Sequence, residues 1–349
     1  MPIPREEYRF LGKTGLRVSS ISLGGWITYG SGQQVEDDKA LEIMDTAFKN
    51  GINFFDTAEG YGAGECEVTF GNVIKKLGWK RSHYVLSTKI YFGTDKDVNG
   101  KGLSAKHLAE GIDASLKRLQ HDYVDIVFAH RPDKYTPMEE VVRAFTQIIR
   151  QGKAFYWGTS MWNAYEIERA NHIATKYNLI PPVAEQPVYN LLERDWFERE
   201  YEPLFRDYGY GTTVFSPLAT GLLTGKYTDP DNTPEGSRYS AENRKNHADI
   251  EAMYQAKVAK VKHLLPTISE LGSLAKELDV PLAALSLAWL LKNPNVSTVI
   301  TGASRPEQIV QNIEAYKVLP KLTDEVLERI EKIVNNKPAL RDDFGRLGN

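Results

Sequence analysis

Short apolar runs alternate with amphipathic segments along almost the whole chain. Each amphipathic segment places apolar residues three or four positions apart, which is typical of a helix packed on one face. In residues 35–50, for example, Ala40, Met44 and Ala47 share one face, and Gly51 follows as a C-terminal cap. The apolar runs between such segments are short and end in glycine or polar residues, as buried strands do.

We predict eight strand–helix units in this pattern. The predicted strands are 20–23, 52–56, 84–89, 123–129, 154–159, 183–186, 212–216 and 296–300. The predicted helices are 35–50, 65–77, 104–119, 138–150, 165–177, 198–207, 268–278 followed by 282–292, and 306–316. This alternation requires a parallel sheet, and eight units close into a (β/α)8 TIM barrel. A doubly wound sheet is the alternative, disfavoured because no strand is followed by G-x-G-x-x-G.

Other segments add to this barrel. Residues 8–18 predict an N-terminal β-hairpin around a glycine turn. We expect one domain over residues 1–349, with a long polar loop at about 227–251 and a C-terminal helix and tail at about 323–349. Long loops on one face of a barrel often clamp a ligand, although a tolerated surface insertion is the alternative.

Composition and charge narrow the classes of function. The net charge of −3 argues against a nucleic-acid-binding protein. The single cysteine, Cys66, cannot form an intrachain disulfide, which favours a reducing compartment. The N-terminus lacks the apolar core of a signal peptide, and the longest apolar stretch, residues 280–291, is too short to span a bilayer. We therefore expect a cytoplasmic protein without membrane insertion.

Polar residues follow the predicted strands where a barrel places its active site. They are Asp56, Lys89, His130, Ser160, Gln186 and Ser216, with Tyr61 in the loop after Asp56.

Together these groups suit the protonation of a carbonyl oxygen. A tyrosine with a pKa near 10 is a poor acid, and a neighbouring ammonium lowers that pKa. We expect Lys89 to lower the pKa of Tyr61 and Asp56 to keep Lys89 charged. His130 would hydrogen-bond a substrate carbonyl beside Tyr61. A Schiff-base aldolase using Lys89 is a rival hypothesis, disfavoured because a charged lysine is no nucleophile. We predict no metal site, since the histidines lack H-E-x-x-H spacing.

Several motifs in fixed order resemble those of the aldo-keto reductases over almost the whole chain. They are FFDTAE at 54–59 with Tyr61, STK at 87–89, FAHRPD at 128–133, YWGTS at 156–160, FSPLA at 215–219 and GAS at 302–304. Within that family the chain looks most like the branch that contains the voltage-gated potassium channel β subunits. Residues 12–19, 131–133, 136–140 and 336–338 are similar to that branch.

The resemblance implies a barrel that binds NADP(H) without a Rossmann fold. It implies a catalytic tetrad of Asp56, Tyr61, Lys89 and His130, with Tyr61 as the proton donor and the nicotinamide as the hydride source. Ser160 and Gln186 would bind the carboxamide, and Phe215 would stack on the ring. Further implied cofactor contacts are Gly25, Trp26, Asp56, Ser216, Pro217, Leu218, Lys226, Arg238, Gly302, Ser304, Gln308 and Asn312. The substrate pocket would be walled by Trp26, Tyr91, Phe92 and Trp162.

We therefore expect an NADPH-dependent reductase that converts small aldehydes or ketones to alcohols. His130 stands where the channel subunits carry asparagine, which favours turnover. The alternative is a non-catalytic, cofactor-sensing subunit with a channel partner. The branch resemblance also favours a homotetramer.

Overall fold

The computed structural model describes residues 2–26, 28–29, 35, 37–227, 229, 233–235, 237, 239–246, 248–339, 344 and 346. The chain divides into two compact units. The first comprises Met1–Val188, Trp196–Phe215 and Pro294–Ile313, and the second comprises Tyr189–Asp195, Ser216–Asn293 and Glu314–Asn349. The expectation of one domain over residues 1–349 stays a prediction, and each unit is described by itself.

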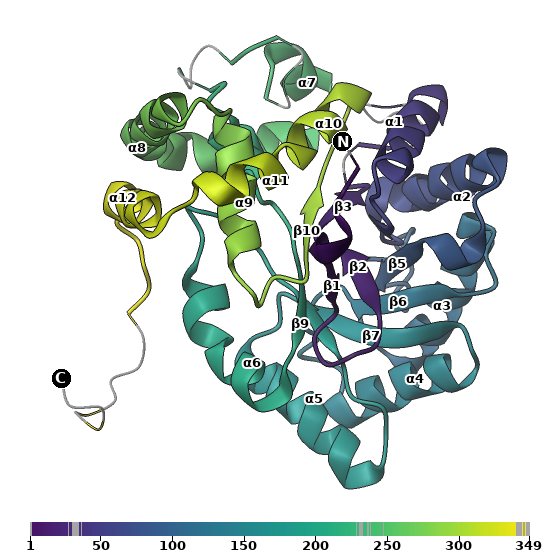
Figure 1. Cartoon of the computed structure of the whole chain (residues 1–349). Coiled ribbons are helices and arrows are strands. Elements are labelled where there is room, and N and C mark those ends of the chain that lie inside the picture. Colours follow the sequence, from purple (N-terminus) through teal and green to yellow (C-terminus); the bar gives the residue numbers. More distant parts are fainter. Residues whose placement is uncertain are drawn as a thin grey trace. The chain divides into compact units, whose positions relative to one another are not determined.

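The first unit is built on a closed barrel of eight parallel strands, which confirms the predicted TIM-like fold (Figure 1). Strands β9 and β10 close the ring through the pair Val299↔Val214. Around the barrel the order is β10 (Thr298–Thr301), β3 (Ile21–Gly24), β4 (Phe54–Asp56), β5 (Val85–Ile90), β6 (Val124–Ala129), β7 (Ala154–Ser160), β8 (Ala184–Gln186) and β9 (Gly211–Val214).

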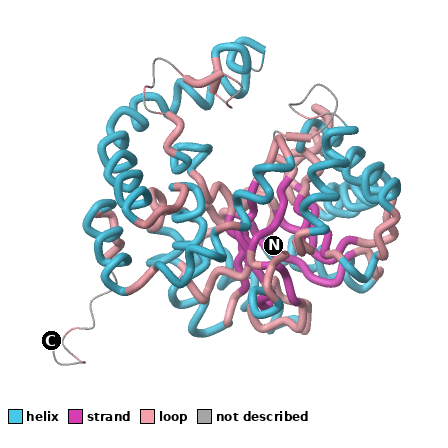
Figure 2. Tube along the Cα trace, turned by 45° about the horizontal axis from the view of Figure 1, so that its top comes forward, coloured by secondary structure: helices cyan, strands magenta, loops and turns pink. Residues whose placement is uncertain are grey.

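Helices cover the outside of this barrel, and consecutive ones from α1 to α5 pack side by side (Figure 2). Side-chain caps fix where two of them begin. Ser104 accepts a hydrogen bond from the His107 amide, and Asn163 and Glu166 form a reciprocal capping box. The helices of this unit are α1 (Asp37–Lys49), α2 (Glu65–Leu77), α3 (Ala105–Leu119), α4 (Met138–Arg150), α5 (Ala164–Tyr177), α6 (Glu202–Tyr208) and α10 (Pro306–Ile313).

The predicted N-terminal hairpin is confirmed as β1 (Tyr8–Phe10) paired antiparallel with β2 (Arg17–Ser19). Leu11 and Val18 of this segment join a buried cluster with Phe54 and Val85, the first residues of β4 and β5. The hairpin therefore covers the N-terminal end of the barrel. The C-terminal ends of the strands, where the polar residues lie, are left to form a site.

Two sequence-based helix boundaries change in the first unit. The helix predicted at 198–207 divides into a π-helix (Trp196–Glu200) and α6. Pro203 lies in the first turn of α6, and a proline cannot donate the hydrogen bond that would continue a helix through it. The helix predicted at 306–316 ends at Ile313 within this unit.

The second unit is helical in its described residues. It contains η5 (Ala219–Thr224), α7 (Ala241–Asn246), α8 (Ala248–Glu277), α9 (Leu282–Lys292), α11 (Ala315–Val318) and α12 (Asp324–Val334). Helix α8 packs against α9 and α12. The predicted C-terminal helix forms but ends at Val334, where Asn335 adopts a left-handed conformation.

The prediction of a polar loop at 227–251 is partly wrong. Its described residues include α7 and the first turn of α8. Ser240 caps α7 by accepting a hydrogen bond from the Asn243 amide. The helix α8 was predicted only from residue 268 onward, because Pro266 lies inside it and a proline usually interrupts a helix. In its N-terminal half, Ile250 and Tyr254 are buried.

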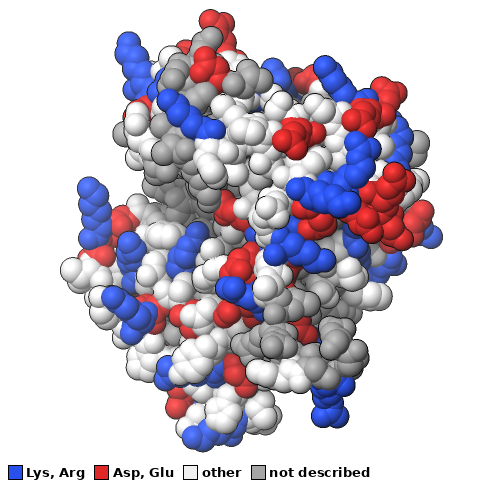
Figure 3. Space-filling view, turned by 90° about the vertical axis from the view of Figure 1, so that its left-hand side faces the viewer, with Lys and Arg blue, Asp and Glu red and all other residues white. Residues whose placement is uncertain are grey.

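Surface charge and helix length bear on possible partners. On the face drawn in Figure 3, basic and acidic side chains are interspersed. Within the described part of the chain, none of the helices combines the length and apolar character that a bilayer crossing requires.

Candidate active site

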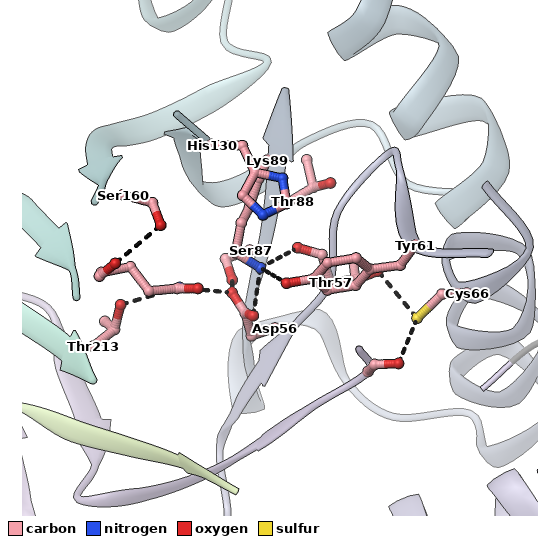
Figure 4. A network of polar contacts seen from close by, with 12 residues as sticks. Asp56, Thr57, Tyr61, Cys66, Ser87, Thr88, Lys89, His130, Ser160 and Thr213 are labelled. Atoms are coloured by element: carbon pink, nitrogen blue, oxygen red, sulfur yellow. Dashed lines mark hydrogen bonds and ion pairs between the residues drawn. The ribbon is translucent and has the colours of Figure 1, made fainter. Parts of the chain in front are cut away.

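Lys89 is the centre of a polar network at the C-terminal end of the barrel (Figure 4). Its side chain lies on β5 and is fully buried. The ammonium nitrogen lies 2.5 Å from Asp56 Oδ2, 2.8 Å from the Thr57 carbonyl oxygen and 2.9 Å from Tyr61 Oη. An ammonium has three N–H donors, so each one has an acceptor. The ammonium is therefore held in one position and donates to the phenol.

Asp56 links this ammonium to two further strands. It ends β4, and its Oδ1 accepts hydrogen bonds from Ser87 Oγ at 2.6 Å and from Gln186 Nε2 at 3.1 Å. The carboxylate thus joins β4, β5 and β8 at the mouth of the barrel. Its multiple donors offset the cost of burying a charge.

Tyr61 is presented by a strained turn. It begins a short 3-10 segment, Tyr61–Gly64, in which Gly62 and Ala63 have φ values of 58° and 53°. Gly64 follows at φ 99°, and a Cβ there would lie 2.8 Å from Arg118 Cδ. Few side chains tolerate these positive φ angles, so the glycines allow the chain to turn back directly after the phenol.

The pKa shifts correct one expectation from the sequence. Burial alone lowers the pKa of Lys89, but the Asp56 carboxylate and the Tyr61 phenol raise it above its usual value. Burial raises the pKa of Tyr61, and the Lys89 charge lowers it only in part. The expected net lowering for Tyr61 is therefore wrong, because burial outweighs the ammonium. At neutral pH the pair holds a charged lysine and a protonated phenol.

His130 completes the cluster from the end of β6. Its ring meets the Tyr61 ring edge-to-face, with 5.6 Å between centroids, and lies 5.0 Å from the Phe92 ring. Burial, and then the charges of Lys89 and Arg131, hold the pKa of His130 well below its usual value. The imidazole is therefore neutral near pH 7. Its Nδ1 atom is buried and has no hydrogen-bond partner within the described residues.

The groups near this histidine suit a nicotinamide carboxamide, which offers both N–H donors and a carbonyl acceptor. Ser160 Oγ donates to the Gln186 carbonyl oxygen at 2.9 Å and keeps a lone pair to accept with. Gln186 Nε2 bonds to Asp56 and Thr213, whereas its side-chain oxygen makes no hydrogen bond within the described residues. Together with the unpartnered Nδ1 of His130, these free positions fit the implied cofactor.

Four other residues expected to contact the cofactor lie between the end of β10 and the last turn of α10. The Ser304 amide donates to Gln308 Oε1 at 2.7 Å, and Asn312 is buried one turn further along. A Cβ added to Gly302 would meet no atom within 4 Å, so space is open beside it. The adenosine-end contacts of Gly302, Ser304, Gln308 and Asn312 remain predictions.

Two further residues expected to contact the cofactor follow barrel strands: Gly25 follows β3, and Phe215 follows β9. The Gly25 amide donates to the Asp56 carbonyl oxygen, and a Cβ on Gly25 would lie 2.3 Å from Cys66 Sγ. Phe215 continues the sheet after β9, where its amide donates to the Pro187 carbonyl oxygen. The stacking expected of Phe215 stays a prediction.

The remaining expected contacts belong to the second unit. Ser216 has a φ of 56°, and its carbonyl oxygen accepts from Asn190 Nδ2 at 3.0 Å. Pro217 and Leu218 follow it, and Lys226 is exposed. Arg238 lies outside the described residues.

The four aromatic residues expected to wall a substrate pocket differ in burial. Trp26 and Phe92 are 41% and 40% exposed, and Tyr91 is half-buried. Trp162 is only 1% exposed, and its carbonyl oxygen accepts from Tyr201 Oη. Trp162 therefore belongs to the packed interior, whereas the other three are accessible.

Two buried acids near the mouth were not predicted. Glu59 Oε1 accepts from the amides of Tyr91 and Gly93, at 2.7 and 2.9 Å, and lies 3.1 Å from His107 Nε2. It ties the Tyr61 loop to the loop after β5. Glu185 on β8 accepts from Thr159 Oγ1 at 2.5 Å and supports the turn after Ser160.

Comparison with known proteins agrees with this architecture. The model of the aldo/keto reductase family matches residues 20–335. The chain belongs to the aldo/keto reductase family. Membership in this family implies NAD(P)H-dependent carbonyl reduction, and it confirms the resemblance seen in the motifs.

Several relatives of this aldo/keto reductase cover nearly its whole length. A protein of Schizosaccharomyces pombe assigned as a voltage-gated potassium channel β subunit is 53% identical over 95% of this chain and 94% of its own. Proteins so assigned in Oryza sativa subsp. japonica and Arabidopsis thaliana are 47% and 46% identical, each over 97% of this chain and 99% of its own. The predicted likeness to the channel β-subunit branch is confirmed.

Proposed function

We propose that this protein is an NADPH-dependent reductase of aldehydes or ketones in which Tyr61 is the proton donor. The observation that carries the proposal is the 2.9 Å hydrogen bond from Lys89 Nζ to Tyr61 Oη. An ammonium that donates to the phenol stabilises the phenolate formed when the proton leaves. The raised pKa of Tyr61 keeps the phenol protonated before reaction, as a general acid requires.

His130 has a separate part in this proposal. As a neutral imidazole it has one N–H to donate, and it lies against the Tyr61 ring. It would orient a carbonyl oxygen beside the phenol without competing as the acid. An uncharged donor also avoids a second positive charge beside Lys89.

The cofactor supplies the other half of the reduction. When bound, NADPH would supply the hydride, and Tyr61 would give its proton to the carbonyl oxygen, so that the product is the alcohol. Ser160 and Gln186 would hold the carboxamide. The proposed preference for NADPH over NADH rests on the family motifs and on cationic side chains near the adenosine end, such as the exposed Arg305.

A turnover assay tests the proposal. NADPH oxidation is measured against a panel of aldehydes and ketones for the wild type and Tyr61→Phe. We expect wild-type turnover and a loss of about 10²–10⁴-fold in kcat for Tyr61→Phe. NADPH affinity, measured by fluorescence titration, should be retained in that variant. Full activity of Tyr61→Phe would refute Tyr61 as the acid.

A cofactor-sensing channel subunit is the second candidate. The relatives assigned as potassium channel β subunits favour it, because they are about half identical over nearly the whole chain. Such a protein would bind NADPH, show no turnover with any carbonyl and co-purify with a channel. Turnover with the panel together with loss of it in Tyr61→Phe would favour the enzyme.

A further inference from the structure

One arginine at the barrel mouth is half-buried and forms no ion pair with an acid among the described residues. Arg131 directly follows His130 at the end of β6. Its Nη1 donates to the His130 carbonyl oxygen and, at 3.3 Å, to Ser160 Oγ. Both acceptors are neutral, and no carboxylate among the described residues forms an ion pair with this guanidinium. A buried charge is normally paired, so this one lacks its usual counter-charge.

Most of the donors of this guanidinium remain available. Its Nε and Nη2 atoms make no hydrogen bond within the described residues, and they are not among the polar atoms sealed from solvent. One edge of the planar group is thus occupied by backbone and hydroxyl oxygens, and the other is open. An open guanidinium edge matches the two oxygens of a carboxylate.

The open edge belongs to the same cluster as the proposed reacting groups. The Arg131 Cζ atom lies 5.8 Å from the centre of the Phe92 ring, and that ring lies 5.0 Å from the His130 ring. Phe92 is itself 40% exposed. A ligand that passes over Phe92 can therefore meet both the imidazole and the guanidinium.

We propose that Arg131 is a subsite for the carboxylate of an anionic aldehyde or ketone. Its Nε and Nη2 groups would donate to the two carboxylate oxygens while the carbonyl of the same molecule lies at Tyr61 and His130. The choice of a carbonyl compound rests on the proposed reductase function. The guanidinium would then favour anionic substrates over neutral ones. Phe92 would cover the apolar part of the substrate between its carbonyl and its carboxylate.

A charge-matched substrate pair tests this subsite. The ratio of kcat/KM for 4-formylbenzoate to that for its neutral methyl ester is measured in the wild type, Arg131→Met and Arg131→Lys. Because both substrates share one aldehyde, the ratio cancels any general loss of activity. We expect the wild type to prefer the anion by about tenfold to a hundredfold, the usual worth of a charge-assisted pair. Arg131→Met should bring the ratio near one, and Arg131→Lys should fall between.

Lys134→Met is the matched control. Lys134 lies three residues further along the same loop and is exposed, and its ammonium lies 4.9 Å from the centre of the Tyr135 ring. It removes the same charge, and the ratio should stay at the wild-type value. An equal fall of the ratio in Lys134→Met would show a long-range charge effect and overturn the subsite.

The alternative is that Arg131 only positions Ser160. Arg131→Met would then weaken NADPH binding and lower both substrates alike, with an unchanged ratio, and the proposal would be wrong. If no carbonyl is turned over, the reductase proposal fails separately, and calorimetry with benzoate on the NADP-saturated protein tests the subsite. Benzoate binding that is lost in Arg131→Met would support the subsite, and no binding to the wild type would overturn it.

Discussion

Strand β5 lies against buried charge on both of its faces, and the two sides differ in what the charge touches. Inside the barrel, Lys89 pairs with Asp56 at 2.5 Å and reaches the Tyr61 phenol. Outside, the neighbouring Thr88 donates to Glu67, which pairs with Arg118 at 2.7 Å. Both pairs lose hydration on folding. Only the inner pair also contacts a group at the barrel mouth that can give up a proton, the Tyr61 phenol.

The direction of the pKa shifts follows the same division. In the outer pair the effect of burial on the pKa is larger than that of the neighbouring charge, so the pKa of Glu67 is raised despite the Arg118 guanidinium. In the inner pair Asp56 and Tyr61 together outweigh burial, so the pKa of Lys89 is raised. A buried charge alone therefore does not mark an active site. What marks it is a buried charge whose partners include an ionisable group at an open mouth.

Removing the inner cation should have the largest effect. Lys89→Met takes away the donor to Tyr61 and leaves Asp56 buried without its counter-charge. We expect kcat/KM to fall by about 10³-fold or more and the free energy of unfolding to fall by about 3–5 kcal/mol. Steady-state kinetics and urea unfolding measure the two. The double variant Asp56→Asn/Lys89→Met should regain stability without regaining activity.

Removing the outer cation should affect stability alone. Arg118→Met leaves Glu67 buried and unpaired, so the free energy of unfolding should fall by about 3–5 kcal/mol. Turnover per folded molecule should stay within a few-fold of the wild type, because Arg118 does not touch the proposed reacting groups. A thousandfold loss of turnover here would erase the distinction between the two faces.

Glu59 should show an intermediate effect. Glu59→Leu leaves the Tyr91 and Gly93 amides without their acceptor, and each lost partner costs about 1–3 kcal/mol. The loop that carries Phe92 would loosen, so KM should rise more than kcat falls. Glu59→Gln keeps an oxygen acceptor and should lie closer to the wild type. Equal kinetics for the two variants would argue against a role for these hydrogen bonds in holding the loop.

Glu185 offers the most gradual effect, since it is a buried carboxyl with no ion pair among the described residues. Burial raises its pKa to about 8 from 4.5. The folded state therefore holds this proton more tightly than the unfolded state does, and stability declines as pH rises from about 4.5 through about 8. Glu185→Gln removes this decline, which amounts to at most about 1.4 kcal/mol per pH unit. Parallel stability–pH curves for wild type and variant would contradict it.

Much of the fold could be predicted from hydrophobic periodicity. All eight barrel strands and helices such as α2 and α4 lie where the pattern placed them, because the strands are short and largely buried and the helices bury one apolar face. The start of α8 was missed although Ile250, Tyr254, Val258, Val261 and Leu265 recur at helical spacing, because Pro266 follows them and a proline usually interrupts a helix. Pro203 was visible in the sequence, but the π-helix before it depends on packing.

The candidate site was predictable to a lesser degree. Strand ends identified Asp56, Lys89 and His130, since parallel strands bring those positions to one rim. The net pKa shift of Tyr61 was not predictable, because it depends on how far burial outweighs one charge. Glu59 and Glu185 were missed because an acid buried by tertiary contacts looks like any surface acid in a sequence. Arg131 was visible only as part of a motif, and its missing counter-charge appears only in the structure.

The central claim is that Lys89 acts through the Tyr61 phenol, and a double-mutant cycle tests it most directly. We would measure kcat/KM for wild type, Tyr61→Phe, Lys89→Met and the double variant with one aldehyde at saturating NADPH. If the ammonium serves the phenol, Lys89→Met should cost little once the hydroxyl is gone, and the double variant should lie within a few-fold of Tyr61→Phe. Fully additive losses would contradict the account.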